Sequence, residues 1–166
     1  MRRLTTLIFI LFFISPAVFA QEEKVPDSPY KYFHDIQFGV TVAFTGIGPF
    51  PLAELSSSHG ICFSDKFEAG LGLSTIYFLT ITPYVIAKYN LVPKTTPRVN
   101  IPYLALKAGY MVYLKKGDSD HNSLNIEPRL GFSHIRKNRK SSWTLFASAN
   151  AFQGMVFPKL GFGFEF

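Results

Sequence analysis

The chain has 166 residues and a formal net charge of +6, and 16% of its residues are aromatic but only 17% are charged. Soluble domains typically carry ~25% charged residues. The single cysteine, Cys62, excludes an internal disulfide. Beyond the N-terminal segment, the sequence lacks the ~18 consecutive apolar residues that a membrane-spanning helix requires.

The first twenty residues follow the pattern of a secretory signal peptide. Arg2 and Arg3 form a short basic region, residues 7–13 are almost all apolar, and small residues lead to Ala20. This order is typical of an export signal, and we expect cleavage after Ala20. An uncleaved membrane anchor is the alternative. The apolar run is shorter than the ~20 residues that a spanning helix needs, which disfavours it.

The rest of the chain predicts eight strands. In the first of them, residues 35–45, Ile36, Phe38 and Val40 alternate with polar or small residues. A period of two indicates an extended strand with one apolar face. The predicted strands cover residues 35–45, 54–63, 67–76, 79–89, 101–114, 124–135, 142–153 and 156–166. The strand at 54–63, which contains Ser56, Ser57 and Ser58, has the weakest pattern.

The last predicted strand has the clearest apolar face after the first. Lys159, Gly161, Gly163 and Glu165 lie on one side, and Phe157 is the only large apolar residue among them. The opposite side carries Val156, Pro158, Leu160, Phe162, Phe164 and Phe166. In a membrane barrel this face contacts lipid, and the final aromatic residue belongs to the interfacial girdle.

Strands of about ten residues separated by turn signals predict a closed barrel. Only a closed sheet satisfies every backbone polar group in lipid without helices. We expect connections at one end over residues 46–53, 77–78, 115–123 and 154–155, and at the other end over 64–66, 91–100 and 136–141. The apolar 46–52 segment either rests on lipid headgroups or is an ordinary turn. With eight strands, side chains fill the interior.

If the apolar faces point outward, charged side chains on the opposite faces line the interior. This set has four acidic and four basic members: Asp35, Glu68, Lys88, Lys107, Glu127, Arg129, Lys159 and Glu165. Buried charges are tolerated when they pair, and this set balances. We therefore predict a packed, non-conducting interior. A slip of register in one or two strands, with a partly coincidental balance, is the alternative.

Three segments carry a resemblance to a known class of proteins: residues 101–110, 126–132 and 160–166. On these, the chain resembles the small outer-membrane barrels of Bacteroidetes, similar in architecture to OmpX- and OmpA-type barrels. The resemblance implies an all-β, antiparallel up-and-down barrel in the outer membrane of a Gram-negative bacterium. It also implies that Phe162, Phe164 and Phe166 belong to a signal read by the barrel-assembly machinery. The expected organisation is a signal peptide (1–20), a periplasmic leader (21–33) and the barrel (34–166).

The expected partners are outer-membrane lipid, lipopolysaccharide and, during biogenesis, the assembly machinery. The basic run at 136–140 indicates a turn facing phosphate-rich surroundings and no nucleic-acid site. We expect a monomer without cofactor or metal, with a structural or interaction role and both termini in the periplasm.

Two other functions stay open. A lipid-modifying hydrolase or acyltransferase needs a hydroxyl activated by a base. The candidates are His134 beside Ser133, His59 beside Ser58, and His121 in the acidic 115–122 loop, which could also hold Ca²⁺. Adjacent strand residues face opposite sides, which argues against direct cooperation between Ser133 and His134. A secreted lipocalin-like barrel would instead turn its apolar faces inward around a ligand.

Overall fold

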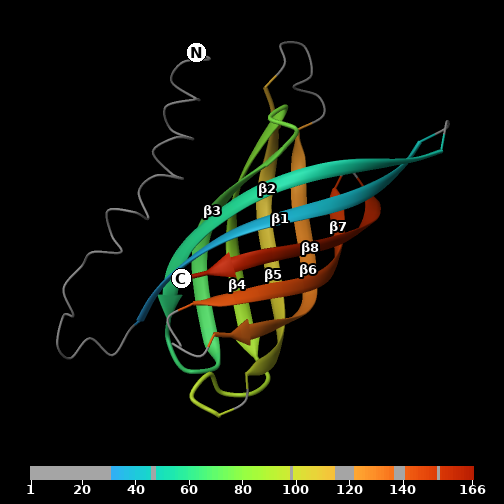
Figure 1. Ribbon diagram of the computed structural model, residues 1–166. Coiled ribbons are helices and arrows are strands. Elements are labelled where there is room, and N and C mark those ends of the chain that lie inside the picture. The colour runs from blue at the N-terminus through green and yellow to red at the C-terminus, as the bar shows by residue number, and fades with distance from the viewer. Residues whose placement is uncertain (1–30, 46–47, 98, 115–121, 137–140, 153) are drawn as a thin grey trace.

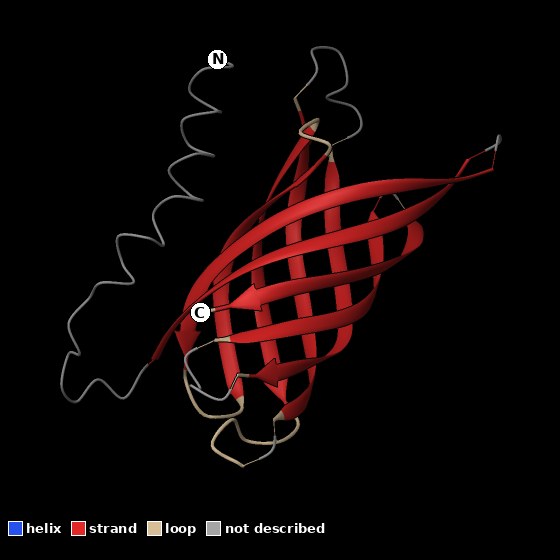
Figure 2. Ribbon diagram, viewed as in Figure 1, coloured by secondary structure: helices blue, strands red, loops and turns tan. Residues whose placement is uncertain are grey.

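The computed structural model describes residues 31–166 except 46–47, 98, 115–121, 137–140 and 153. It contains eight strands: β1 (Lys31–Thr45), β2 (Gly48–Cys62), β3 (Phe67–Ile76), β4 (Thr80–Asn90), β5 (Asn100–Tyr113), β6 (Ser123–Ile135), β7 (Ser142–Phe152) and β8 (Met155–Glu165). Each strand pairs antiparallel with the next, and β8 pairs with β1 to close the barrel (Figures 1 and 2). In the described part of the chain, no helix has the length and apolar character needed to cross a membrane.

The predicted all-β, eight-stranded fold is confirmed, and two strands are longer than the sequence indicated. β1 begins at Lys31, inside the predicted 21–33 leader, because Lys31 pairs with Cys62 of β2. β2 begins at Gly48, so the connection predicted at 46–53 is wrong from Gly48 onward. The predicted signal peptide, most of the leader and the His121 loop lie outside the described residues.

Pro49 and Pro51, near the start of β2, are the reason why the sequence indicated a loop there. The carbonyl oxygen of Pro51 accepts a hydrogen bond from the hydroxyl of Tyr77, which follows β3. The backbone polar groups of Pro51 therefore point toward β3 and away from β1, to which it is paired in register. At Pro51 this side of β2 is an edge, because the pairing of β2 with β3 begins only at Glu54. The N–H that proline lacks is therefore not needed for a ladder bond.

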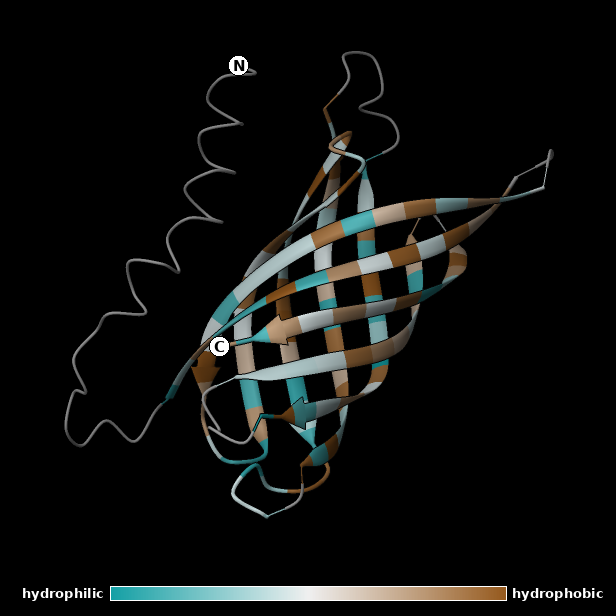
Figure 3. Cartoon of the chain, viewed as in Figure 1, coloured by the Kyte–Doolittle hydropathy of each residue, from teal (hydrophilic) through white to brown (hydrophobic). Residues whose placement is uncertain are grey.

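The outer surface of the barrel is apolar on every side. Large side chains such as Leu71 (66% exposed) and Leu160 (69% exposed) alternate along the strands with buried polar ones. Figure 3 shows this alternation as brown bands separated by paler or teal residues. Val156, Phe162, Phe164 and Phe166 are exposed, as the period-two pattern of the last strand predicted. Phe157, the exception to that pattern, is buried inside.

The interior contains three stacks of a glycine, an aromatic ring and a cation. Tyr84 lies over Gly72, Tyr103 over Gly131 and Phe146 over Gly161, and each glycine is the cross-strand partner of its ring. A cation lies over each ring: Lys107 over Tyr84 at 4.2 Å, Lys88 over Tyr103 at 4.8 Å and Arg129 over Phe146 at 4.5 Å from the ring centroid. The glycines provide the space in which the rings lie flat on the wall, and the rings stabilise the cations.

We expect Gly161→Ala to lower the free energy of unfolding by about 1–3 kcal/mol through overpacking. A Cβ at Gly161 would lie 2.3 Å from the ring of Phe146 and 2.7 Å from the Phe38 carbonyl oxygen. Urea unfolding in detergent measures the effect. Ala147→Val is the control, because it adds carbon atoms beside Phe146 on the exposed outer face, away from the stack. Equal effects of both substitutions would contradict the stacked arrangement.

The two ends of the barrel differ. We call the end with the β1–β2, β3–β4, β5–β6 and β7–β8 connections the upper end, and the end with residues 31 and 166 the lower end. Near the upper end, Met111, Phe152 and Phe157 form a buried apolar cluster in which the two phenyl rings stack 4.7 Å apart. Near the lower end, the β4–β5 connection bonds to the β2–β3 connection through Lys94 N and Asp65 O, 3.0 Å apart.

Candidate functional site

The charged interior is the part of the molecule with the most specific chemistry. The structure buries all eight predicted charges, none more than 8% exposed. Along β8 they follow the apolar cluster: Phe157 is nearest the upper end, then Lys159, and Glu165 lies at the lower end. Apart from Asp35, the charges form two groups, one in the middle of the barrel and one near the lower end.

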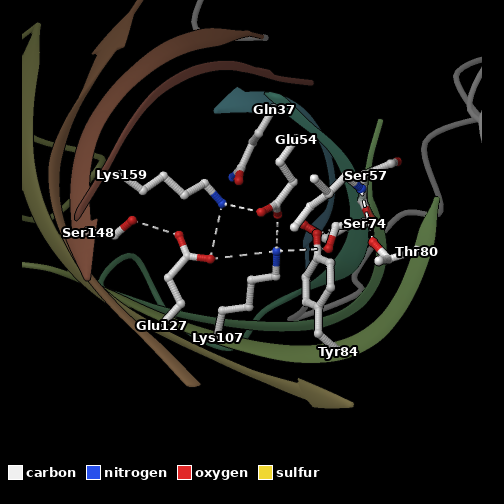
Figure 4. Close-up of polar contacts among 12 residues, drawn as sticks. Gln37, Glu54, Ser57, Ser74, Thr80, Tyr84, Lys107, Glu127, Ser148 and Lys159 are labelled. Carbon is white, nitrogen blue, oxygen red and sulfur yellow. Dashed lines mark hydrogen bonds and ion pairs between the residues drawn. The ribbon is translucent and has the colours of Figure 1, made fainter. Parts of the chain in front are cut away.

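The central group contains two carboxylates and three cations. The Nζ of Lys107 lies 2.6 Å from Glu54, and the Nζ of Lys159 lies 2.8 Å from the other oxygen of Glu54. Both ammonium groups also approach Glu127, at 3.7 Å and 3.1 Å respectively. Figure 4 shows the two lysines between the two glutamates. Ser148 donates a further hydrogen bond to Glu127 at 2.7 Å.

Arg129 connects the central group to Asp35. Its Nε donates to Glu127 at 2.8 Å, and its Nη1 donates to Gln37 at 2.5 Å. Gln37 in turn donates to Asp35 at 2.8 Å, and the hydroxyl of Ser58 donates to the other oxygen of Asp35. A hydrogen-bonded path therefore runs from the central group through the neutral side chain of Gln37 to Asp35.

The lower group contains two carboxylates and two lysines. Lys88 bonds to Glu165 at 2.6 Å and lies 3.4 Å from Glu68. Lys94, which belongs to the β4–β5 connection and not to a strand, bonds to Glu68 at 2.5 Å and also to Glu165. Asn90 donates a hydrogen bond to Glu68 at 2.7 Å. Lys94 thus spans the lower mouth of the barrel.

Two of these charged residues were missed from the sequence. Glu54 is 3% exposed and joins Lys107 to Lys159, and Lys94 joins Glu68 to Glu165. The described interior therefore holds five carboxylates and five cations, so the balance is kept. Alternation along β2 could have identified Glu54, because it lies on the same side of the strand as Ser56 and Ser58, which are also buried. No periodicity could reveal Lys94, because it lies in a connection.

Arg129→Ala is expected to lower the free energy of unfolding by about 3 kcal/mol or more. The substitution removes the only guanidinium from Glu127 and a hydrogen bond from Gln37. The unfolding midpoint in detergent measures this loss. Arg136→Ala is a control, because Arg136 is exposed near the lower end. An unchanged midpoint for Arg129→Ala would argue against its place inside the barrel.

The histidine candidates for catalysis are separated by the fold. His134 contacts Asn100 at 2.7 Å and stacks on Trp143, whereas Ser133 is buried. The hydroxyl of Ser58 bonds to Asp35 and not to a histidine. A pair that the sequence did not indicate, His34 Nε2 and Ser57 Oγ, lies 3.0 Å apart. Among the described residues, no group of three or more metal-binding side chains comes together.

The aromatic residues assigned to the assembly signal lie on the outer wall. Phe162, Phe164 and Phe166 are 46%, 41% and 60% exposed. Phe166 follows the last residue of β8, and its backbone exchanges hydrogen bonds of 2.8 Å and 3.1 Å with His34. Phe166 therefore extends the pairing of β8 with β1 to the last residue of the chain.

A hollow of about 240 Å³ lies at the lower mouth. Its lining includes Lys31, Phe33, Cys62, Lys94 and Glu165. Lys94 and Glu165 of the lower group line this hollow, whereas no residue of the central group is among its lining residues. The hollow is therefore part of the mouth and does not lead to the central group.

Two solved barrels match this structure over most of its length. Neisserial surface protein A matches with a TM-score of 0.59 and 13% sequence identity, covering 83% of this chain and 96% of that protein. The N-terminal β-barrel domain of Pseudomonas aeruginosa OprF matches with a TM-score of 0.58 and 13% identity, covering 81% of this chain and 97% of that domain. The chain has the fold of these barrels. Comparisons with protein-family models and with curated proteins find no match.

Proposed function

We propose that the protein is an integral outer-membrane barrel with a packed, non-conducting interior and a structural or interaction role. The observation that carries the proposal is a charge-balanced interior inside a wall whose outer face is apolar. Four of its five buried carboxylates form ion pairs with five cations, and Asp35 bonds to Gln37 and Ser58. The origin among small barrels of Bacteroidetes belongs to the same proposal, and so does the periplasmic position of both termini.

The orientation of the wall favours lipid over water around the barrel. Leu71, Leu104, Leu130 and Leu160 are each close to half exposed or more, and they come from four different strands. Monomeric soluble proteins rarely expose continuous apolar patches larger than a few hundred Å². A lipocalin-like barrel would need these side chains inside and the charged ones outside, the reverse of the arrangement found. Outer-membrane lipid and lipopolysaccharide are the surroundings we propose.

We propose that the barrel does not conduct ions, because side chains close its interior at three levels. Met111, Phe152 and Phe157 occupy the upper level, the central ion pairs the middle, and Lys94 the lower mouth. An ion crossing the barrel would have to break buried ion pairs, each of which is expensive to leave uncompensated.

Single-channel recording tests this part of the proposal. We expect purified, refolded protein in a planar bilayer to give no stable conductance steps. A matched variant, Glu54→Ala with Lys94→Ala, removes one charge from the central group and one from the lower mouth, and any conductance should appear first in that variant. Stable steps from the unmodified protein would contradict a packed interior.

A further inference from the structure

The outer wall is hollowed over β3, β4 and β5. A hollow of about 410 Å³ opens there, on the opposite side of the wall from the buried charges. None of its lining residues has a polar side chain, and six of them define what we call the trough: Ala69, Leu71, Val85, Ala87, Leu106 and Ala108. The trough is separate from the hollow at the lower mouth, with which it shares no lining residue.

The strand register explains why the wall is hollow here. Ala69 is the cross-strand partner of Ala87, and Ala108 pairs with Val85 on the next outward-facing row above. The three alanines therefore lie on a diagonal across three strands. Their side chains end at Cβ, whereas Leu71 and Val85 stand beside them at 66% and 53% exposure. The result is a low floor of alanines bordered by larger apolar side chains.

The size of the trough fits a slender ligand better than a second barrel. Ligand sites in proteins measure roughly 300–1,000 Å³, and the trough falls within that range. A stable contact between two proteins buries about 800 Å² on each partner. Such a contact would rest on the broad convex wall and would not need the trough. A flexible hydrocarbon chain fits both the shape of the trough and its apolar lining.

Polar groups lie beyond the lower end of the trough. Tyr89 follows Ala87 by two residues on the same outer face and is 45% exposed. No described residue bonds to its hydroxyl group. Tyrosine is typical of positions where an apolar surface meets a polar layer, such as a membrane interface.

Lys66 supplies a cation at the same end. It directly precedes β3 and takes part in none of the ion pairs among the described residues. Its neighbour Asp65 lines the hollow at the lower mouth, but Lys66 does not. From the lower end upward, the wall thus presents a cation, a hydroxyl group and an apolar trough. This is the order of phosphate, ester and acyl chain in a phospholipid.

We propose that the trough binds one acyl chain of a phospholipid from the lipid layer around the lower part of the barrel. The chain lies on Ala69, Ala87 and Ala108. The hydroxyl of Tyr89 donates a hydrogen bond to an ester carbonyl oxygen, and the ammonium group of Lys66 binds the phosphate. These two polar contacts distinguish the bound lipid from its neighbours along the wall. This inference rests on the proposed membrane location.

Native mass spectrometry tests the site. The protein is refolded into vesicles of equal parts phosphatidylethanolamine and phosphatidylglycerol and is then transferred to a mild detergent. We expect a major species that retains one phospholipid. Ala87→Leu fills the trough and should lower the lipid-bound fraction severalfold. Ala108→Leu is a second variant with the same expected result, should Ala87→Leu not fold.

Two controls match these changes. Ala147→Leu makes the same substitution at an exposed alanine between Leu130 and Leu160 on the outer wall, and should leave the bound fraction unchanged. Lys66→Gln should lower the bound fraction severalfold. Lys31→Gln, which changes an exposed lysine at the same end, should not.

Absence of bound lipid, or a bound fraction that the leucine variants do not lower, would overturn the lipid site and leave the membrane location intact. A doubled protein mass that Ala87→Leu abolishes would instead make the trough a contact between two copies, and would also overturn the lipid site. A protein that stays soluble without detergent and does not enter the vesicles would overturn both the site and the membrane location.

Discussion

Replacing Glu127 with alanine is expected to lower the free energy of unfolding by about 3–5 kcal/mol. Glu127 is 0% exposed and bonds to Arg129 and Lys159, with Lys107 at 3.7 Å. Its removal leaves three buried cations with Glu54 as their only carboxylate. Equilibrium unfolding in urea, with the protein held in one detergent, measures the loss.

Two variants separate the effect of charge from that of packing. Ser148→Ala removes one neutral hydrogen bond from Glu127 and should cost only about 1 kcal/mol. In the double variant Glu127→Ala with Arg129→Ala, both charges of one pair are removed, so the loss should be smaller than the sum of the two single losses. Additive losses would mean that the two side chains do not depend on one another.

Phe166→Ala is expected to reduce the amount of assembled barrel in cells severalfold while leaving the stability of the refolded protein almost unchanged. The phenyl ring is 60% exposed, so it buries little apolar surface in the folded barrel. The backbone bonds of residue 166 to His34 do not need the ring. A recognition role in assembly, which the family resemblance implies, would therefore appear in cells and not in the refolded protein.

Heat-modifiable mobility of membrane extracts measures the assembled fraction, and urea unfolding measures stability. Leu160→Ala serves as the control, because Leu160 is 69% exposed on the same strand and the same face. If both substitutions reduce assembly equally, the last residue has no special role. If Phe166→Ala greatly destabilises the refolded protein, the cause is structural.

The alternation of apolar and polar side chains predicted the strands and most of the residues that face the interior. Both follow from the period of two along a strand. In β3–β8, each strand begins and ends within one or two residues of its prediction. Every strand-borne charge that parity placed inside, from Asp35 on β1 to Glu165 on β8, is buried. A wall one residue thick alternates between lipid-facing and interior-facing positions, so a local pattern is enough to identify the side.

The failures came from features that a local pattern does not contain. Pro49 and Pro51 indicate a loop, and only the direction of the Pro51 carbonyl shows that an edge strand accommodates them. Lys94 enters the interior from a connection, where residues have no alternation. The closure of the sheet depends on the register of β1 against β8, which joins the two ends of the barrel sequence.

The stacks of glycine, ring and cation explain why small residues recur on the inner face. Gly72, Gly131 and Gly161 weaken the pattern of their strands as read from sequence alone. Each is the cross-strand partner of Tyr84, Tyr103 or Phe146, and each ring lies beneath a charge. The pairing partners of these strands, which a single sequence does not specify, decide which glycine receives which ring.

Membrane fractionation of the source cell, followed by gel electrophoresis with and without boiling, tests the central claim most directly. We predict that the protein is found in the outer-membrane fraction and that boiling changes its mobility, because a closed barrel resists detergent until heated. A soluble protein with no shift on boiling would contradict the account. The outer apolar wall would then need a protein partner to cover it.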